Sequence, residues 1–220
     1  RPDLQLLILD DAFQHRKLNS DFRIVLTPYS IPFSKDHLLP LGRLRESRSG
    51  AKRADVVVVT KCPAELSQYE KSKVAEGLAP YLNPEADLFF SSLTYGKPYQ
   101  VAGPTQTAIS SVIALAGLAD NAPFFAYCKQ QYAVLDSFSF SDHHAYRPED
   151  AARILEVLGQ EKGKNAVLLT TEKDAVKLKS LAATEMWSKI SIFALPIQVA
   201  LEPSQEEQLL QRLRKTLLHP

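Results

Sequence analysis

Short apolar runs alternate with helical patterns along most of this chain. The runs predicted to form strands cover residues 6–9, 24–26, 56–59, 88–90, 112–115, 132–135, 166–170 and 190–199. Most of them are continuous stretches of aliphatic or β-branched side chains, which is typical of parallel strands covered on both faces. Because helical patterns separate these strands, the sequence predicts an α/β architecture with mainly parallel sheets.

Three helices are predicted between or after the strands. Apolar side chains fall on one helical face over residues 67–82 and again over residues 203–217. A third helix begins near Pro148, since proline is tolerated in a first turn, and ends at Gly159. Residues 96–104 are rich in glycine, proline and polar side chains, which predicts a linker between two parts of the chain.

The composition narrows the class of protein. With 220 residues, 45% hydrophobic and 23% charged, the chain suits a folded protein with one large domain or two small ones. The net charge of +1 gives no general electrostatic reason to bind nucleic acid. Cys62 and Cys128 lack the spacing of metal ligands, so neither a zinc site nor a disulfide framework is expected. No apolar run approaches the roughly 20 residues of a membrane span, and no signal peptide is recognisable.

Two acids follow the first apolar run. Asp10 and Asp11 come directly after residues 6–9, and ligands of open α/β sheets bind at the carboxyl ends of strands. A carboxylate there can hold Mg²⁺ directly or through water, although the alternative is an acid that caps the next turn. Successive strand side chains point to opposite faces, so only one acid would face a site unless the chain turns after Asp10. Gln14 and His15 add an amide and an imidazole, and His15 alone is better explained as a structural histidine.

A second polar cluster lies just before the predicted helix at Pro148. Residues 140–146 read Phe-Ser-Asp-His-His-Ala-Tyr, which places His143 and His144 behind Asp142. Adjacent histidines can serve a metal, a phosphate or a proton transfer, because histidine is the usual general base near neutral pH. The alternative is a surface loop whose aspartate hydrogen-bonds its own backbone.

Residues 38–46 form a predicted loop that carries Arg43 and Arg45. Arginine suits bidentate recognition of phosphate, although a run of charge is usually just solvated surface. Leucines occupy positions 38, 39, 41 and 44 of the same loop. Such apolar side chains are unusual in a charged loop, and they would suit a lipid-like substrate.

Lys61 ends the valine-rich run that begins at residue 56. GTP-binding proteins use a similar lysine to hold the base, but the aspartate expected two positions later is replaced here by Pro63, so a guanine site is not supported. Residues 170–174 also end a strand with polar side chains, and these can cap the helix that follows.

Taken together and in this order, these motifs resemble the tetraacyldisaccharide 4'-kinases of lipid A biosynthesis. The matching stretches are Asp-Asp-x-Phe-Gln-His at 10–15, Leu-Pro-x-Gly-x-Leu-Arg-Glu at 39–46, Ala-Asp-Val-Val-Val-Val-Thr-Lys at 54–61, Ala-Leu-Ala-Gly-Leu at 114–118, Phe-Ser-Asp-His-His-x-Tyr at 140–146 and Thr-Glu-Lys-Asp-Ala-Val-Lys-Leu at 171–178. Each motif alone is moderately specific, whereas six in order over nearly the whole chain are strongly specific. Ala12 and Ser141 depart from the glycine and proline common at those positions, without removing a functional group.

The resemblance implies a fold and a domain organisation. It implies the remainder of a P-loop-type α/β/α domain and a smaller α/β domain, joined by a two-stranded linker. The expected division is 1–92 for the first domain, 93–107 for the linker, 108–189 for the smaller domain, 190–202 for a returning strand and 203–220 for a helix that packs back on the first domain.

The resemblance also implies an activity, in which the γ-phosphoryl of ATP moves to the 4'-hydroxyl of a tetraacyldisaccharide 1-phosphate. It implies ATP and Mg²⁺ as cofactors, a lipid-linked disaccharide as substrate, no nucleic acid, and a location at the cytoplasmic face of the Gram-negative inner membrane. Carried over by position, the implied roles are metal binding for Asp10 and Asp11, nucleotide binding for Lys61 and Gln14, substrate binding for Arg43, Arg45 and His144, and catalysis for His143.

One required motif has no match in these 220 residues. A P-loop reads Gly-x-x-x-x-Gly-Lys-Ser/Thr, and no pair of the eight glycines has that spacing ahead of a lysine. Family members carry the P-loop, a membrane-anchoring helix and the aspartate partner of the histidine before the position of Arg1, so this chain is expected to be a soluble, inactive fragment.

Two other readings remain open. A metal-dependent phosphoesterase would gather Asp10, Asp11, His15 and His143 around Mn²⁺ or Zn²⁺. A non-catalytic binding module would have lost the P-loop altogether.

Overall fold

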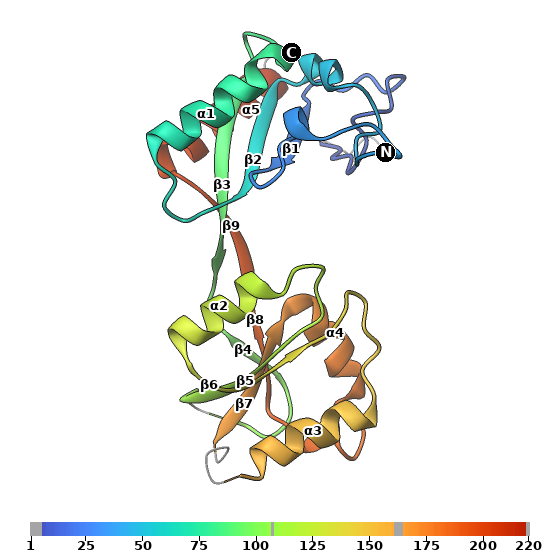
Figure 1. Ribbon diagram of the computed structural model, residues 1–220, viewed down its shortest axis with the longest axis vertical. Helices are drawn as coiled ribbons and strands as arrows, with labels where there is room; N and C mark the ends of the chain where they lie inside the picture. Colours follow the sequence, from blue (N-terminus) through green and yellow to red (C-terminus); the bar gives the residue numbers. More distant parts are fainter. Residues whose placement is uncertain (1–5, 107, 161–164, 219–220) are drawn as a thin grey trace. The chain divides into compact units, whose positions relative to one another are not determined.

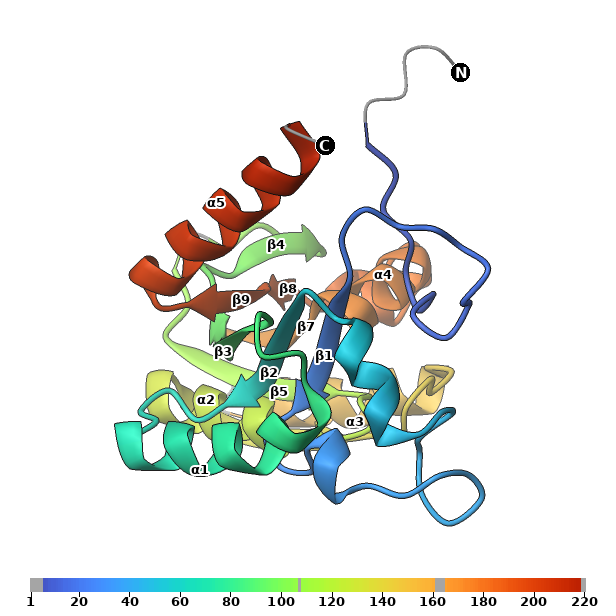
Figure 2. The ribbon, with the colours of Figure 1, turned by 90° about the horizontal axis from the view of Figure 1, so that it is seen from above.

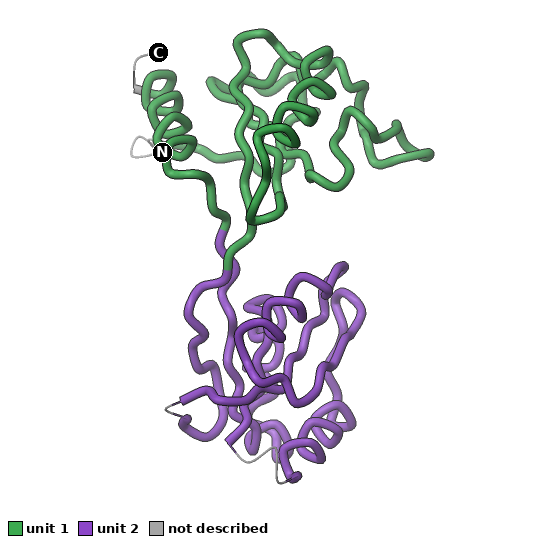
Figure 3. Tube along the Cα trace, turned by 60° about the vertical axis from the view of Figure 1, so that its left-hand side comes forward, with its two compact units in different colours: residues 1–94, 199–220 green, residues 95–198 purple. Residues whose placement is uncertain are grey.

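The computed structural model describes residues 6–106, 108–160 and 165–218 (Figure 1). The chain divides into two compact units, each with its own sheet (Figure 3). Unit 1 comprises residues 1–94 and 199–220, and unit 2 comprises residues 95–198. The prediction of an α/β fold with mainly parallel sheets is confirmed. No helix of the described ranges is both long and apolar enough to cross a membrane.

The sheet of unit 1 has four strands in the order β1-β2-β3-β9. Their bounds are Ile24–Pro28 for β1, Val56–Cys62 for β2, Asp87–Tyr95 for β3 and Ile197–Leu201 for β9. β2 runs parallel to both β1 and β3. The carboxyl ends of these three strands therefore lie at the same edge of the sheet, where the connecting loops can collect polar side chains.

Two helices cover opposite faces of this sheet (Figure 2). α1 spans Gln68–Leu78 and α5 spans Pro203–Leu218, while short 3₁₀ turns η1, η2 and η3 occupy Phe33–Lys35, Arg48–Arg53 and Ala79–Tyr81. Alternation along β2 explains the layering, since successive side chains point to opposite faces. Val56 and Val58 pack with Leu209 of α5, whereas Val59 packs with Val74 and Leu78 of α1.

The sheet of unit 2 has five strands in the order β4-β8-β7-β5-β6. The bounds are Tyr99–Ala102 for β4, Ser111–Ala116 for β5, Ala133–Ser139 for β6, Ala166–Thr171 for β7 and Ile192–Leu195 for β8. β4 is antiparallel to β8, and the other neighbours are parallel. Pro196 separates β8 from β9, because proline cannot donate a ladder hydrogen bond.

Helices cover both faces of this second sheet. α2 spans Ala122–Gln131, α3 Pro148–Leu158, α4 Glu172–Leu181 and the 3₁₀ turn η5 Trp187–Lys189. Ala114 of β5 packs in one core cluster with Phe124 of α2, whereas its neighbour Ile113 packs in another with Ile154 of α3 and Trp187 of η5. β5 is thus buried on both faces, as its continuous aliphatic sequence predicts.

The order of the strands creates a switch point between β5 and β7. After β5 the chain passes through α2 to β6 on one side, and then through α3 to β7 on the other side of β5. The loops that follow β5 and β7 consequently leave the sheet in opposite directions. The crevice outside such a switch point is the usual ligand position in open α/β sheets.

The predicted buried strand at residues 6–9 is wrong. These residues are irregular, and their four aliphatic side chains are all exposed, Ile8 by 82%. A strand needs backbone partners, and residues 6–9 form no hydrogen bond with any described strand. Helix α2 was missed because only Phe124 and Cys128 of it are buried, which leaves a weak helical pattern.

Truncation in the core of unit 2 tests this packing. Ile154→Ala on α3 removes a fully buried side chain and should lower the free energy of unfolding by about 2–5 kcal/mol. The sole tryptophan, Trp187, lies in the same cluster, so its fluorescence in a urea titration reports the change directly. Val176→Ala on exposed α4 surface should change the value by no more than about 0.5 kcal/mol. Equal effects of the two changes would contradict the proposed core.

Candidate active site

Asp10 and Asp11 lie in a turn at the end of the exposed segment 6–9. Asp11 has a φ of 52°, in the left-handed region that aspartate tolerates better than most residues. The side-chain amide of Gln14 donates a hydrogen bond of 2.9 Å to the Asp11 carbonyl oxygen. The turn removes the strict strand alternation, so the two carboxylates are not forced onto opposite faces.

Arg45 is the residue that meets Asp11. Its Nη2 donates to Asp11 Oδ1 at 2.5 Å, and both side chains are exposed. This hydrogen bond, with the charge of the guanidinium, holds the pKa of the Asp11 carboxyl below its usual value. Arg43 turns elsewhere, since its Nε donates to Asp36 Oδ2 at 2.9 Å. Arg43 and Arg45 lie two residues apart in the sequence, but they bind different acids, Asp36 and Asp11.

A second set of contacts joins the turn at residues 10–13, called here the acid turn, to Glu46 at the end of the loop that carries Arg43 and Arg45. Arg53 donates to Glu46 Oε1 at 2.7 Å and to the Phe13 carbonyl at 3.1 Å, and its guanidinium lies 4.6 Å from the centroid of the Phe13 ring. Arg16 donates to the other oxygen of Glu46 at 3.2 Å. Arg53 therefore positions the turn that contains Asp10 and Asp11. The sequence did not suggest this role, because Arg48, Lys52 and Arg53 form a basic run of the kind that is usually solvated surface.

Lys61 lies near the carboxyl end of β2, with an exposed side chain and a φ of 56°. The register between β2 and β3 shifts between Val59 and Cys62, which explains the unusual backbone at this lysine. Among the described residues, Lys61 forms no hydrogen bond or ion pair with Asp10 or Asp11.

The carboxylates of Asp10 and Asp11 suit a magnesium ion. Mg²⁺ prefers oxygen ligands and is commonly held by one or two carboxylates, with water and substrate phosphates completing its shell. In the part of the chain that the structure describes, no three His, Cys, Asp or Glu side chains gather into a metal-binding group.

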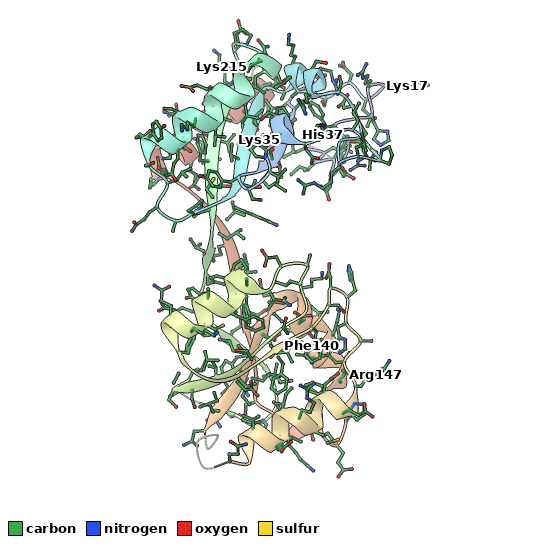
Figure 4. The ribbon with its side chains drawn as sticks, in the orientation of Figure 1. Lys17, Lys35, His37, Phe140, Arg147 and Lys215 are labelled. Carbon is green, nitrogen blue, oxygen red and sulfur yellow. The ribbon has the colours of Figure 1, made fainter. Side chains whose placement is uncertain are left out.

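In unit 2, His143 lies in the loop between β6 and α3, which runs from Phe140 to Arg147 (Figure 4). Its side chain is 78% exposed, and its backbone has a φ of 60°. The backbone N–H donates to Asp142 Oδ1 at 2.9 Å, while the ring Nε2 lies 3.7 Å from Asp142 Oδ2. The loop thus presents the imidazole to solvent beside a carboxylate.

His144 has different surroundings. Its Nε2 lies 3.0 Å from Asp150 Oδ2 on α3, and its ring stacks on Phe140 with centroids 4.2 Å apart. Asp150 also accepts the backbone N–H of Arg147 at 2.9 Å, which caps α3. Of the two adjacent histidines, His144 anchors the loop and His143 projects from it.

Helix α4 holds the same loop from the other side. Lys173 Nζ pairs with the Asp142 carboxylate, and this contact holds the pKa of Asp142 below its usual value. Lys177 Nζ donates to the His144 carbonyl at 3.2 Å. The two lysines are four residues apart, so they lie on one face of the helix.

Asp174 fixes the start of α4 against the end of β5. This fully buried carboxylate accepts hydrogen bonds from the Gly117 backbone at 2.9 Å and the Thr171 hydroxyl at 2.7 Å. A Cβ at position 117 would lie only 3.0 Å from Asp174 Oδ1, so glycine permits the close approach. Burial, with the charge of Asp174, raises the pKa of the nearby Tyr146 phenol. The cap expected at residues 170–174 is real, since the Thr171 side chain caps α4, but the sequence did not indicate that Lys173 and Lys177 hold the loop of His143.

An open groove of about 690 Å³ adjoins this loop. It is lined by the loop after β5, the start of α2 and the end of β6, including Asp120, Asn121, Ser139, Ser141 and Asp142. Asn121 donates to the Ser139 hydroxyl and to the Phe140 carbonyl, both at 2.9 Å, and so joins the two loops. The groove lies at the carboxyl ends of β5 and β6, where α/β proteins place ligands.

The fold defines an α/β protein, and most of these side chains lie in loops that follow parallel strands, whereas Asp10 and Asp11 lie in a turn before β1. A family model described as tetraacyldisaccharide-1-P 4'-kinase matches residues 1–214. The chain belongs to this family, which confirms the resemblance seen in the sequence motifs.

Individual relatives agree with the family match. The chain is 38% identical to the tetraacyldisaccharide 4'-kinase of Flavobacterium psychrophilum over 198 residues, which cover 88% of this chain and 54% of the relative. It is 34% identical to that of Bacteroides thetaiotaomicron, with 96% and 59% covered, and 35% identical to that of Porphyromonas gingivalis, with 98% and 61% covered. The chain therefore spans little more than half the length of these relatives.

The two arginine pairs allow a matched test by titration. Arg45→Gln removes the partner that stabilises ionised Asp11, so the pKa of Asp11 should rise toward its ordinary value of about 4. Arg43→Gln should instead raise the pKa of Asp36 and leave Asp11 unchanged. Both are measured from the carboxyl carbon shifts in a pH titration by NMR. A rise at Asp11 in both variants would contradict the separate pairing.

Proposed function

We propose that this chain forms part of a kinase that transfers the γ-phosphoryl group of ATP to the 4'-hydroxyl of a tetraacyldisaccharide 1-phosphate. The observation that carries the proposal is the family match over residues 1–214, together with relatives that are named for this activity. The lipid-linked acceptor places the reaction at a membrane surface, which we assign to the cytoplasmic face of a bacterial inner membrane.

In unit 1, Asp10 and Asp11 are assigned to hold Mg²⁺, which when bound neutralises charge on the phosphates of ATP. Arg45 occupies Oδ1 of Asp11, so the second oxygen and the exposed Asp10 carboxylate are available for this role. Lys61 and Gln14 are assigned to the nucleotide.

Arg43 and Arg45 are assigned to the anionic groups of the substrate. Their guanidinium groups are exposed on the loop that follows η1 and can present paired N–H donors to phosphate oxygens. For Arg45 this contact competes with Asp11, so substrate binding and the state of the acid turn are linked.

In unit 2, His143 is assigned as the base that takes the proton of the attacking hydroxyl. An exposed imidazole can reach a bound acceptor, and Asp142, itself held by Lys173, lies beside the ring and can orient it. His144 is assigned to substrate binding, with Asp150 fixing the direction of its ring.

The 220-residue chain by itself should bind Mg-ATP weakly or not at all. No P-loop sequence occurs in it, and without that set of backbone N–H donors and lysine the two acids repel the triphosphate except through Mg²⁺. Isothermal titration calorimetry is the measurement. Micromolar binding would show that the nucleotide pocket is misplaced, and the roles of Asp10, Asp11 and Lys61 would then be withdrawn.

The role of His143 is tested in a chimera, in which this chain replaces the matching segment of the Flavobacterium psychrophilum relative. His143→Ala should lower kcat by about 10²–10⁴-fold while the KM for ATP changes little, because a general base acts only on the chemical step. Lys179→Ala, an exposed change on α4, serves as the control and should leave kcat unaltered. An equal loss of ATP affinity would assign His143 to the nucleotide instead.

A further inference from the structure

The segment between η1 and η2 projects from one side of unit 1 (Figure 2). We call residues 36–45 the leucine loop. The Leu44 backbone donates to the His37 carbonyl at 2.9 Å, and the Leu39 backbone donates to the Leu44 carbonyl at 3.0 Å. At the tip, the Leu41 and Gly42 backbones both donate to the Leu38 carbonyl, at 3.0 and 3.1 Å. The loop is therefore a hydrogen-bonded structure that closes on itself.

Asp36 fixes the base of the leucine loop. Its carboxylate accepts the backbone N–H groups of His37 and Arg43, at 2.8 and 3.2 Å, as well as Arg43 Nε. Arg48 donates twice to the Asp36 carbonyl, at 2.8 and 3.1 Å. A Cβ at Gly42 would lie 2.3 Å from the His37 carbonyl oxygen, so glycine is needed for the chain to close this tightly. These contacts fix the base of the loop and its tight closure.

The tip presents apolar side chains to solvent. Leu38, Leu39 and Leu41 are exposed by 49%, 61% and 88%, and Leu41 is the most exposed large apolar side chain of the described residues. A single exposed leucine needs no explanation. Three of them on a loop that is closed by its own hydrogen bonds indicate an apolar partner.

The surroundings of the tip are cationic. Residues 35–53 contain six lysines and arginines and two acids, a net charge of +4 with histidine neutral. The whole chain has a net charge of +1, so the remaining residues sum to −3 and the positive charge is concentrated here. Asp36 pairs with Arg43, and Glu46 with Arg16 and Arg53, while Arg45 pairs with Asp11 outside the segment. Lys35, Arg48 and Lys52 form no ion pair with a described acid. Lys35 and His37 flank the start of the loop (Figure 4).

From this apolar tip and its cationic border we infer that the leucine loop inserts into the surface of an anionic lipid bilayer. Apolar side chains enter the boundary between headgroups and acyl chains, while lysine and arginine attract anionic headgroups. A protein partner fits less well, because a stable protein interface buries roughly 800 Å² on each side and needs a broad surface. The three leucines at the tip can penetrate a lipid surface, but they offer too little area for a stable protein interface.

Vesicle binding of the 220-residue chain tests the inference without ATP or acceptor, so its result does not depend on the proposed kinase activity. The chain should float with vesicles of phosphatidylethanolamine and phosphatidylglycerol, and much less with pure phosphatidylcholine. Added salt should weaken the binding, since the attraction between exposed charges is screened.

A matched pair of variants locates the contact. Leu41→Glu should reduce the partition coefficient by about tenfold or more, because the leucine side chain no longer leaves water. Val176→Glu makes the same kind of change at a side chain of unit 2 that is 73% exposed, and it should bind like the unchanged chain. Both sites are exposed, so neither change threatens folding. Equal binding by the two variants, or no binding by the unchanged chain, would overturn the inference.

A fluorescent label distinguishes insertion from attraction at a distance. The two native cysteines are buried, so an environment-sensitive dye can be attached selectively in Leu41→Cys and Val176→Cys. The fluorescence emission of the dye at position 41 should shift to shorter wavelength on addition of anionic vesicles, and the emission of the dye at position 176 should not. A response at 41 to dispersed acceptor lipid but not to vesicles would assign the loop to acyl chains of the substrate and overturn bilayer insertion.

Discussion

Parallel strand pairing is the constraint on which the rest of this structure depends. A parallel strand must be followed by a crossover, so every loop that leaves a carboxyl end starts from the same edge of its sheet. β5, β6 and β7 show the consequence in unit 2, where the histidine loop, the groove and the Asp174 contact all lie at these ends. β1 and β2 do the same in unit 1, where Lys61 lies near the end of β2.

Charged side chains fix the two segments that carry the candidate residues, the loop at residues 140–147 and the turn at residues 10–13. The histidine loop is held by Lys173 and Lys177 from α4 and by Asp150 from α3. The acid turn is held by Arg45 and Arg53. Exposed ion pairs usually add little stability, about 0–1 kcal/mol. Their function here is to orient the loops. Asp174 differs from them because it is buried, and its hydrogen bond from Gly117 fixes the start of α4 to the end of β5.

Local patterns predicted most of the strands, because burial on both faces leaves a continuous aliphatic run, but β4 lies within the stretch predicted as a linker. Val56 to Val59 and Val112 to Leu115 are such runs, and both are buried. Residues 6–9 have the same composition but no described strand beside them, so the pattern alone was misleading. An apolar composition shows that a segment favours burial, but it does not show which strand the segment pairs with. Strand pairing depends on residues that are distant in the sequence.

The sequence indicated candidate site residues, whose roles stay predictions, but it did not indicate their contacts. Asp11, Arg45 and His143 belong to recognisable motifs, yet nothing local indicates that Arg45 meets Asp11 while Arg43 meets Asp36. The same holds for Lys173, which reaches a residue 31 positions earlier. Such contacts follow from loop geometry at the ends of the strands. The family match, in contrast, covers residues 1–214.

The position of the transferred phosphate tests the central claim most directly. The chimera with the Flavobacterium psychrophilum relative would be incubated with ATP, Mg²⁺ and tetraacyldisaccharide 1-phosphate, and the purified lipid examined by ³¹P NMR with proton correlation. A new phosphomonoester coupled to the proton at the 4' carbon is the result that this account predicts. Consumption of ATP without a lipid phosphate, or a phosphate on a different hydroxyl, would contradict it.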